Sequence, residues 1–190
     1  MRFIILASFS LFLSACASFQ SYSHCDIATD SGLPILHPQS FAVNLISTQQ
    51  ISLITEQQNF EFIAQLEINS ERMILVSLTP IGQKLFQIQY SRGQLDFQRF
   101  GIPDTFNPAF LLTDISLVYG RGDILEKCFV QTRLPIQISQ NTSQKRIMII
   151  DGDAIEIQYS TNNPWQSEIE LNNPARGYKI KIKPLALENL

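Results

Sequence analysis

Residues 60–68 read FEFIAQLEI, and this segment decides the fold class. Apolar residues occupy every second position, namely Phe60, Phe62, Ala64, Leu66 and Ile68, and polar ones fall between them at Glu61, Gln65 and Glu67. Because successive side chains of a strand point to opposite faces, this pattern predicts a strand with one dry face and one solvated face. A solvated face is typical of antiparallel sheets.

The same alternation recurs along the chain. It is clear in 155–159 and in 178–182, where Lys179 and Lys181 separate Tyr178, Ile180 and Ile182. Further candidate strands are 41–46, 51–55, 73–78, 85–90, 95–100, 134–138, 145–150 and 167–171. Turn signals rich in Asn, Asp, Gly and Pro separate several of them. About ten or eleven antiparallel strands predict a mainly β fold, a strongly curved sheet that forms an incomplete, half-open β-barrel.

One segment, 107–120, has helical rather than strand character. Asn107 suits the N-cap, Pro108 the first helical position and Gly120 the residue past the end. The apolar positions are Phe110, Leu111, Leu112, Ile115, Val118 and Tyr119, which leave a narrow polar strip at Thr113, Asp114 and Ser116. A helix this apolar must be buried, so we expect it to lie as a lid across the dry concave face, with a second short helix at 123–129.

The amino-terminal residues resemble an export signal. After Arg2, the apolar run 3–13 has the length of a signal peptide core and is too short to span a bilayer. Leu13-Ser14-Ala15-Cys16 then matches the bacterial lipobox, which implies a signal peptide over 1–15 and a Cys16 that carries palmitate-type acyl chains. Ala17 stands where inner-membrane retention signals often place Asp, so the resemblance points to a lipid anchor on the periplasmic face of the outer membrane. The alternative is a signal-anchor helix with an incidental cysteine.

Behind the anchor, the sequence predicts a flexible tether over 16–38 and a single β domain over 39–190. The tether is rich in Ser, contains Gly32, Pro34 and Pro38, and lacks apolar periodicity. Two cysteines remain in the exported chain, Cys25 and Cys128. They can pair as a disulfide or remain as two thiols, and the sequence leaves both open.

Composition excludes several function classes. Loss of Arg2 with the signal peptide leaves 13 Lys and Arg residues against 17 Asp and Glu residues, a net charge of −4, with no basic block. A nucleic-acid partner is therefore not expected. Both histidines, His24 and His37, fall in the predicted tether, so neither a Ser-His-Asp relay nor a histidine-rich metal site has positioned components.

Other polar residues also favour a protein without catalysis. Asp151 and Asp153 flank Gly152, where a hairpin turn explains them. Asp114 is better explained as a structural carboxylate than as a functional one, and Cys128 has no base near it in sequence. We expect no catalytic residue, metal or cofactor.

Three stretches carry a family resemblance. They are 78–88 (LTPIGQKLFQI), the Leu-rich helix about twenty residues later, and 164–182, which contains Pro164-Trp165 and Arg176-Gly177-Tyr178. Over roughly 40–187 the chain resembles an uncharacterised family of bacterial outer-membrane lipoproteins, often encoded with aryl-polyene and fatty-acid-type biosynthesis genes. That family is similar to LolB, the receptor that takes lipoproteins from the periplasmic carrier LolA. The resemblance implies a half-open barrel whose apolar cavity holds acyl chains under a helical lid.

An apolar cavity under a helical lid also identifies candidate residues for ligand binding and for membrane contact. Six residues on dry strand faces or on the apolar helix stripe are candidates for the cavity wall and lid: Phe60, Phe62, Leu66, Leu111, Ile115 and Val118. Ile81 stands between Pro80 and Gly82, where LolB has an apolar residue on a protruding loop that contacts the membrane. Ile81 can equally fold back and cap the end of the barrel, and the apolar stripes can form a filled core without a cavity.

Three functions follow as hypotheses. The first is a non-enzymatic lipoprotein that binds or shuttles lipid, acylated protein or polyene-type cargo, with a LolA-like carrier as a partner. The second is an assembly lipoprotein that docks another envelope protein and binds no lipid. The third is an accessory subunit of an enzyme.

Overall fold

A computed structural model describes residues 24–27, 32–102, 106–131, 136–142, 144–150 and 152–190. The predicted signal peptide, Cys16 and Asp151 lie outside these residues. Within the described part, no helix is both long enough and apolar enough to cross a membrane.

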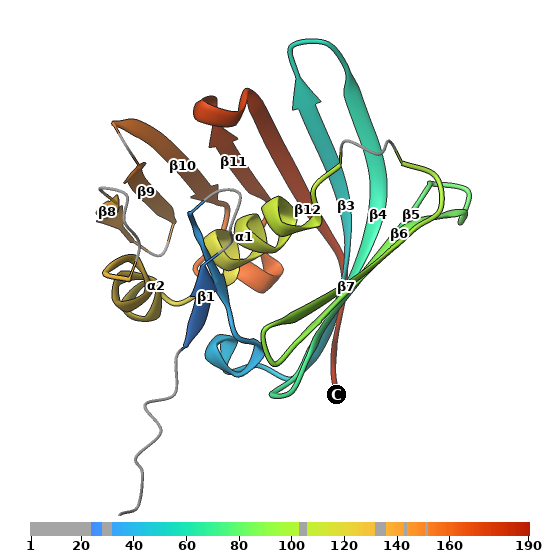
Figure 1. The fold of residues 1–190 in the computed structure, drawn as a ribbon. Helices are drawn as coiled ribbons and strands as arrows, with labels where there is room; N and C mark the ends of the chain where they lie inside the picture. Colours follow the sequence, from blue (N-terminus) through green and yellow to red (C-terminus); the bar gives the residue numbers. More distant parts are fainter. Residues whose placement is uncertain (1–23, 28–31, 103–105, 132–135, 143, 151) are drawn as a thin grey trace, which may run out of the picture.

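One antiparallel sheet of ten strands forms the body (Figure 1). Its order is β7-β6-β5-β4-β3-β12-β11-β10-β9-β8, so β7 and β8 are its two edges and the sheet does not close. The mainly β, open and strongly curved fold predicted from the alternation is therefore confirmed. The strands are β3 (Leu45–Thr55), β4 (Asn59–Ile68), β5 (Met73–Leu78), β6 (Lys84–Ser91), β7 (Gln94–Arg99), β8 (Ile136–Asn141), β9 (Lys145–Ile150), β10 (Asp153–Tyr159), β11 (Ile169–Asn173) and β12 (Tyr178–Asn189).

Several strand boundaries differ from the sequence prediction. The candidate strands 41–46 and 51–55 are wrong as two units, because β3 runs unbroken from Leu45 to Thr55. The sequence does not show that β3 is continuous, because Ser47 and Gln49 are polar and interrupt the apolar alternation. In the structure both are buried on the inner face of the sheet. β12 continues beyond the predicted residue 182 and pairs with β3 along its whole length, with an irregularity between Pro184 and Ala186. β12 thereby joins the carboxy-terminal strands to the amino-terminal ones.

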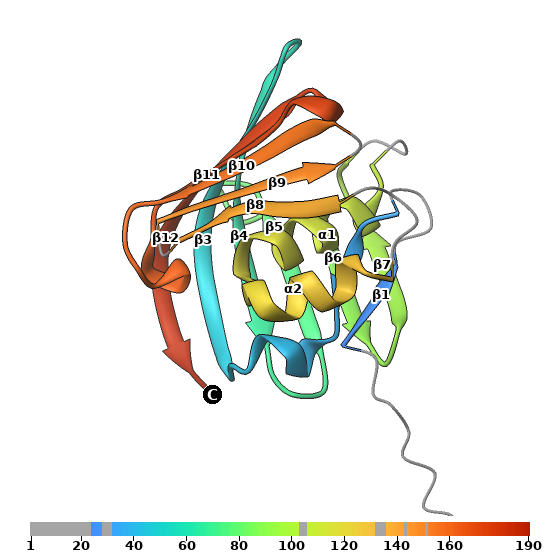
Figure 2. The same cartoon turned by 90° about the vertical axis from the view of Figure 1, so that its left-hand side faces the viewer.

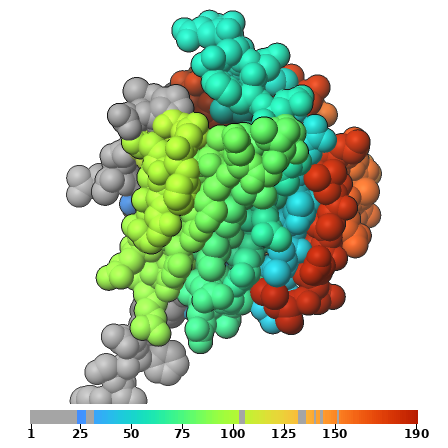
Figure 3. Space-filling view, turned by 90° about the vertical axis from the view of Figure 1, so that its right-hand side faces the viewer, coloured from blue at the N-terminus to red at the C-terminus, as the bar shows by residue number. Residues whose placement is uncertain are grey.

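The outer face of the sheet is solvated. Gln65, Val76, Gln87 and Gln98 lie in register across β4, β5, β6 and β7. These strands form the convex surface seen in Figure 3. The inner face carries the core instead, with Leu66 and Ile88 almost fully buried.

Two helices lie on the concave side of the sheet, α1 (Pro108–Tyr119) and α2 (Gly122–Phe129), as Figure 2 shows. Asn107 caps α1, because its Oδ1 accepts a hydrogen bond from the Ala109 amide at 2.9 Å. At the other end, Arg146 Nη1 donates to the Leu117 carbonyl and Tyr159 Oη donates to the Val118 carbonyl. These bonds satisfy carbonyls that a helix end leaves without partners, and the positive guanidinium suits the negative end of the helix dipole.

The polar strip of α1 is buried together with the apolar positions of the helix. Thr113 and Ser116 have no exposed surface. Ser116 Oγ accepts a hydrogen bond from the Leu36 amide at 2.9 Å and donates to the Leu112 carbonyl. The helix is therefore covered on the side away from the sheet as well.

The covering element is a short hairpin, β1 (Cys25–Ile27) and β2 (Pro34–Leu36), followed by a 3-10 turn, Pro38–Phe41. The flexible tether predicted over 16–38 is thus wrong for 24–27 and 32–38. The sequence did not predict that this hairpin is buried, because strands of three residues are too short to show an alternation of apolar and polar side chains. Cys25 and Cys128 form a disulfide that ties β1 to α2, with Cα atoms 6.1 Å apart.

Both ends of the described chain lie at one end of the barrel. The His37 amide donates to the His24 carbonyl, and the Leu190 amide donates to the Asn44 carbonyl just before β3. The β3–β4 turn and the β5–β6 turn lie at the opposite end (Figure 1).

Candidate functional site

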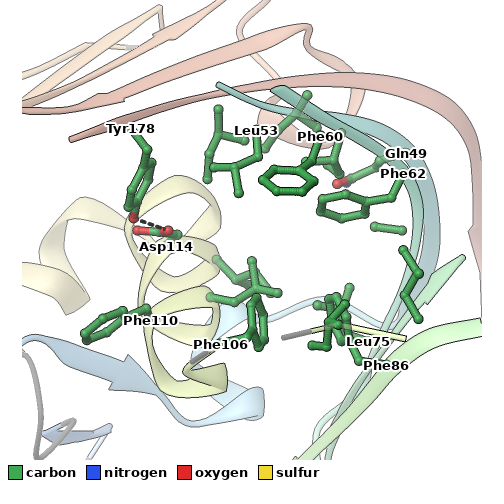
Figure 4. A pocket seen from close by; sticks show the side chains of 18 of the residues that line it. Gln49, Leu53, Phe60, Phe62, Leu75, Phe86, Phe106, Phe110, Asp114 and Tyr178 are labelled. Carbon is green, nitrogen blue, oxygen red and sulfur yellow. Dashed lines mark hydrogen bonds between the residues drawn. The ribbon is translucent and has the colours of Figure 1, made fainter. Parts of the chain in front are cut away.

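A pocket of about 490 Å³ lies between α1 and the concave face of the sheet (Figure 4). Because this cavity is present, the alternative of a filled core is wrong. The side chains that line it are mostly aliphatic and aromatic. All six residues proposed from sequence line it, and they come from two elements: Phe60, Phe62 and Leu66 from β4, and Leu111, Ile115 and Val118 from α1. Sequence reasoning missed the other apolar contributors, which include Leu53, Leu75, Leu85, Phe86, Phe106, Phe110 and Leu171.

The deep end of the pocket is closed. Gln49 Nε2 donates to Tyr119 Oη and to Ser47 Oγ, each at 2.8 Å. The Tyr119 ring stacks on Trp165 with centroids 4.1 Å apart, and burial raises the pKa of Tyr119 above its ordinary value. Polar groups at the floor thus bond one another, and Leu66 beside them is 1% exposed.

One wall of the pocket is aromatic. The Phe86 ring lies 6.3 Å from Phe62, 6.3 Å from Phe97 and 5.0 Å from Phe106, measured between centroids. These rings come from three strands and from the segment that enters α1. Their separations are those of ordinary aromatic packing, so the wall is preformed.

The mouth opens at the end of the barrel that carries the β3–β4 turn. The exposed lining residues are all there: Gln58, Phe60, Glu61 and Gly101. Large apolar side chains are exposed at the same end, with Phe60 at 41%, Phe100 at 55% and Ile81 at 81%. We refer to these three exposed side chains, Phe60, Ile81 and Phe100, as the rim.

Ile81 stands at the tip of the β5–β6 turn. The Gly82 amide donates to the Thr79 carbonyl at 2.9 Å, which places Pro80 and Ile81 at the two central positions of the turn. Gly82 has φ +86°, a conformation that favours glycine. Since Ile81 is 81% exposed, the alternative in which it folds back to cap the core is wrong.

A polar cluster interrupts the apolar lining beside α1. Tyr178 Oη donates to Asp114 Oδ2 at 2.5 Å, and Arg176 Nη1 lies 3.7 Å from Asp114 Oδ1. The Arg176 guanidinium also lies over the Phe110 ring, 4.1 Å from its centroid. Burial raises the pKa of Asp114 to about 6, against the lowering effects of the Tyr178 hydrogen bond and the Arg176 charge.

This cluster is incomplete. Asp114 Oδ1 and Arg176 Nη2 are buried and have no hydrogen-bond partner among the described residues, since 3.7 Å makes an ion pair but not a hydrogen bond. Sequence analysis favoured a structural over a functional role for Asp114, and it named Arg176 and Tyr178 only within a stretch of family resemblance, not as partners of Asp114. Asp114 on α1 is 64 residues from Tyr178 on β12, so no local sequence signal points to the cluster.

The remaining candidates for chemistry have structural surroundings. His37 Nε2 lies 3.6 Å from Asp26 Oδ2, and its ring stacks on Tyr90. His37 is therefore positioned, which the predicted tether did not anticipate. Among the described residues, no group of three or more His, Cys, Asp or Glu could hold a metal ion. Cys128 is joined to Cys25 and is thus not a free nucleophile in this state.

Comparison with known proteins gives one family assignment. No curated protein matches the chain significantly. A family profile described as "Protein of unknown function (DUF3261)" matches residues 47–186, which run from β3 to β12 and include most of the sheet, both helices and all residues that line the large pocket. The chain therefore belongs to the DUF3261 family.

Proposed function

We propose that this protein is an outer-membrane lipoprotein that binds or shuttles acyl-chain cargo in its pocket, without catalysis. The observation that carries the proposal is the apolar pocket between α1 and the sheet, about 490 Å³ in volume and open at one end. Ligand pockets of proteins typically measure about 300 to 1,000 Å³ and are lined mainly by apolar and aromatic side chains. The charged groups of the lining, Glu61 and Asp114, lie at the mouth and beside α1, so the deep end suits a hydrocarbon chain.

The driving force would be burial of the chain in the pocket. Each buried methylene contributes about 0.8 kcal/mol relative to water. A bilayer offers the same gain, so release into it would cost no apolar burial wherever the mouth meets one. No energy source in the protein is needed for such a transfer.

The LolB-like relationship belongs to this proposal. It would make the protein a receptor or carrier for lipid, acylated protein or polyene-type lipid during envelope biogenesis, with a LolA-like periplasmic carrier as partner. The rim formed by Phe60, Ile81 and Phe100 supports a docking or membrane-contact role at the mouth, because these side chains are exposed where cargo would enter. Cys16 would carry the lipid anchor.

The test uses the mature chain with Cys16→Ser, exported behind a signal peptide of the non-lipoprotein type. Native mass spectrometry of the purified protein should reveal co-purified lipid, and an apolar fluorescent acyl probe should bind with one site per chain. Leu66→Glu places a carboxylate at the pocket floor and should abolish probe binding, whereas Leu187→Glu, at a position 37% exposed, should not. A folded protein that takes up no acyl probe would refute the proposal.

The assembly lipoprotein that docks another envelope protein is the second candidate. It is favoured by Leu185, Leu187 and Leu190, which are 50%, 37% and 53% exposed at the chain-end side of the barrel. β11 pairs with β12 only as far as Ile182, so this apolar stretch continues beyond the last β11 pair. Loss of envelope integrity by Leu185→Glu with intact probe binding would favour this second function.

A further inference from the structure

Two buried atoms beside the pocket call for a ligand group. Asp114 Oδ1 can only accept a hydrogen bond when the carboxyl is ionised, and Arg176 Nη2 can only donate one. The two side chains face each other, with Arg176 Nη1 3.7 Å from Asp114 Oδ1, and are 16% and 7% exposed. Buried polar groups in native proteins are almost always paired, so an unpaired acceptor next to an unpaired donor requires an explanation.

The position of the pair connects it to the pocket. Asp114 and Tyr178 line the large pocket, where Figure 4 shows them at one end of the cavity with Phe110 nearby. Arg176 lines a second pocket of about 280 Å³, and Phe110 lines both. The charged pair thus stands where the apolar cavity meets a smaller and more polar one.

We propose that the Asp114–Arg176 pair binds the polar end group of a single-chain lipid, and that this group is a neutral hydroxyl or amide. This inference rests on the proposed acyl-binding function and specifies its ligand. A hydroxyl or a primary amide donates to Asp114 Oδ1 and accepts from Arg176 Nη2 at the same time. A carboxylate accepts from Arg176 but places a second negative charge beside Asp114, and an ester cannot donate.

The volume of the pocket sets the number of chains. At roughly 30 Å³ for each water-sized group, about 490 Å³ holds on the order of 16 methylene-sized groups. That is one acyl chain. A triacylated lipoprotein would have to leave most of its hydrocarbon outside, so the pocket in this form fits a ligand with one chain and one polar end.

The experiment compares four compounds that share one oleoyl chain: monoolein, oleamide, oleate and methyl oleate. Each displaces N-phenylnaphthylamine from the mature Cys16→Ser chain, and the displacement midpoint gives its relative affinity. Monoolein and oleamide should bind about tenfold or more tightly than methyl oleate and more tightly than oleate, because hydrogen bonds to charged groups are the strong ones.

Arg176→Met locates the effect. Methionine keeps an apolar stem over Phe110 and removes the donors, so the advantage of monoolein over methyl oleate should fall to about twofold or less. The affinity for methyl oleate itself should stay within about twofold. Arg121→Met is the matched control, because Arg121 pairs with Asp123 on the exposed surface and should leave the preference intact.

Each other outcome overturns the inference. Equal affinities for monoolein and methyl oleate in the unsubstituted pocket would mean that a buried water alone satisfies the pair, and this comparison needs no variant. Tighter binding of oleate would identify a carboxylate site instead, and a preference that survives Arg176→Met would place the end group elsewhere. In all three cases acyl binding itself stands, whereas failure of all four compounds to displace the probe refutes the proposed function as well.

Discussion

Removal of the Cys25–Cys128 disulfide should lower the free energy of unfolding by about 4 to 5 kcal/mol. The two cysteines are 103 residues apart, and both are buried, Cys25 at 2% and Cys128 at 0% exposed. A crosslink that closes a loop of this size in the unfolded chain stabilises the native state by roughly 4.7 kcal/mol in the loop-entropy treatment. That is a large share of the 5 to 15 kcal/mol typical of native domains.

Urea denaturation of the mature Cys16→Ser chain, oxidised and then reduced, measures this difference directly. The double variant Cys25→Ala/Cys128→Ala should unfold close to the midpoint of the reduced protein, or slightly below it, since the alanines also remove two buried sulfur atoms. A thiol titration of the denatured protein gives the oxidation state in each sample. The slope of the transition should rise on reduction, because an uncrosslinked chain exposes more surface.

The loop-entropy reasoning is refuted if the oxidised and reduced forms differ by less than about 1 kcal/mol. Such a result would mean that β1 detaches locally when the crosslink is cut, while the sheet and helices unfold unchanged. β1 has other contacts that resist detachment, since Tyr90 Oη donates to Asp26 Oδ2 at 2.5 Å. Hydrogen exchange of the Leu36 amide, which bonds Ser116, reports on that hairpin separately.

Four further predictions concern the anchor, the rim, the pocket and the polar cluster. Labelled palmitate should enter the wild-type protein, and Cys16→Ser should abolish the labelling and leave an unprocessed precursor; unchanged labelling would end the lipoprotein assignment. Ile81→Glu should leave stability within about 0.5 kcal/mol, because Ile81 is 81% exposed, yet reduce liposome contact and cargo transfer; a variant that melts early or transfers normally would contradict a membrane-contact role. Leu66→Glu should cost at least about 2 kcal/mol in lost apolar burial and should abolish binding of the acyl probe, with calorimetry as the check. Asp114 binds a proton more tightly in the folded state, where its pKa is about 6, than in the unfolded chain, where it is 3.8. Its contribution to the free energy of unfolding is therefore complete below pH 3.8 and is lost as the pH rises through 6. Asp114→Asn should remove this decline of about 3 kcal/mol in the free energy of unfolding, and parallel pH profiles of the two proteins would disprove it.

Much of the fold could be predicted because its physical causes are local. The alternation in 60–68 specifies a strand with one dry face, and Asn107 with Pro108 specifies a helix start. Six pocket residues followed from the same patterns, since a dry strand face and an apolar helix stripe must meet. β3 was divided in sequence because Ser47 and Gln49 are polar. Gln49 bonds both Ser47 and Tyr119, and Tyr119 is 70 residues away, so the sequence does not reveal this buried network.

The polar cluster could not be predicted in the same way. Asp114 looks like the polar edge of an amphipathic helix, and Tyr178 looks like the dry side of an alternating strand. Their contact joins α1 to β12, two elements far apart in the sequence, so the functional candidate appears only in three dimensions. The hairpin β1–β2 was not predicted for a different reason. It is buried by contacts with α1 and by the disulfide, and its own sequence shows no apolar alternation.

The opposite placement of the pocket mouth and the chain ends limits how far the mouth can reach. β3 has 11 residues, so the barrel is roughly 36 Å long at about 3.3 Å per residue. The eight residue-to-residue steps from Cys16 to His24 span at most about 29 Å when fully extended. If Cys16 is the anchor, a barrel standing upright holds its mouth at least one strand length above its own leaflet, facing the carrier that would dock there. Delivery of cargo into the anchoring leaflet would then require the barrel axis to tilt until it is parallel to the membrane. Cargo would therefore be loaded and released in two different orientations of one rigid body.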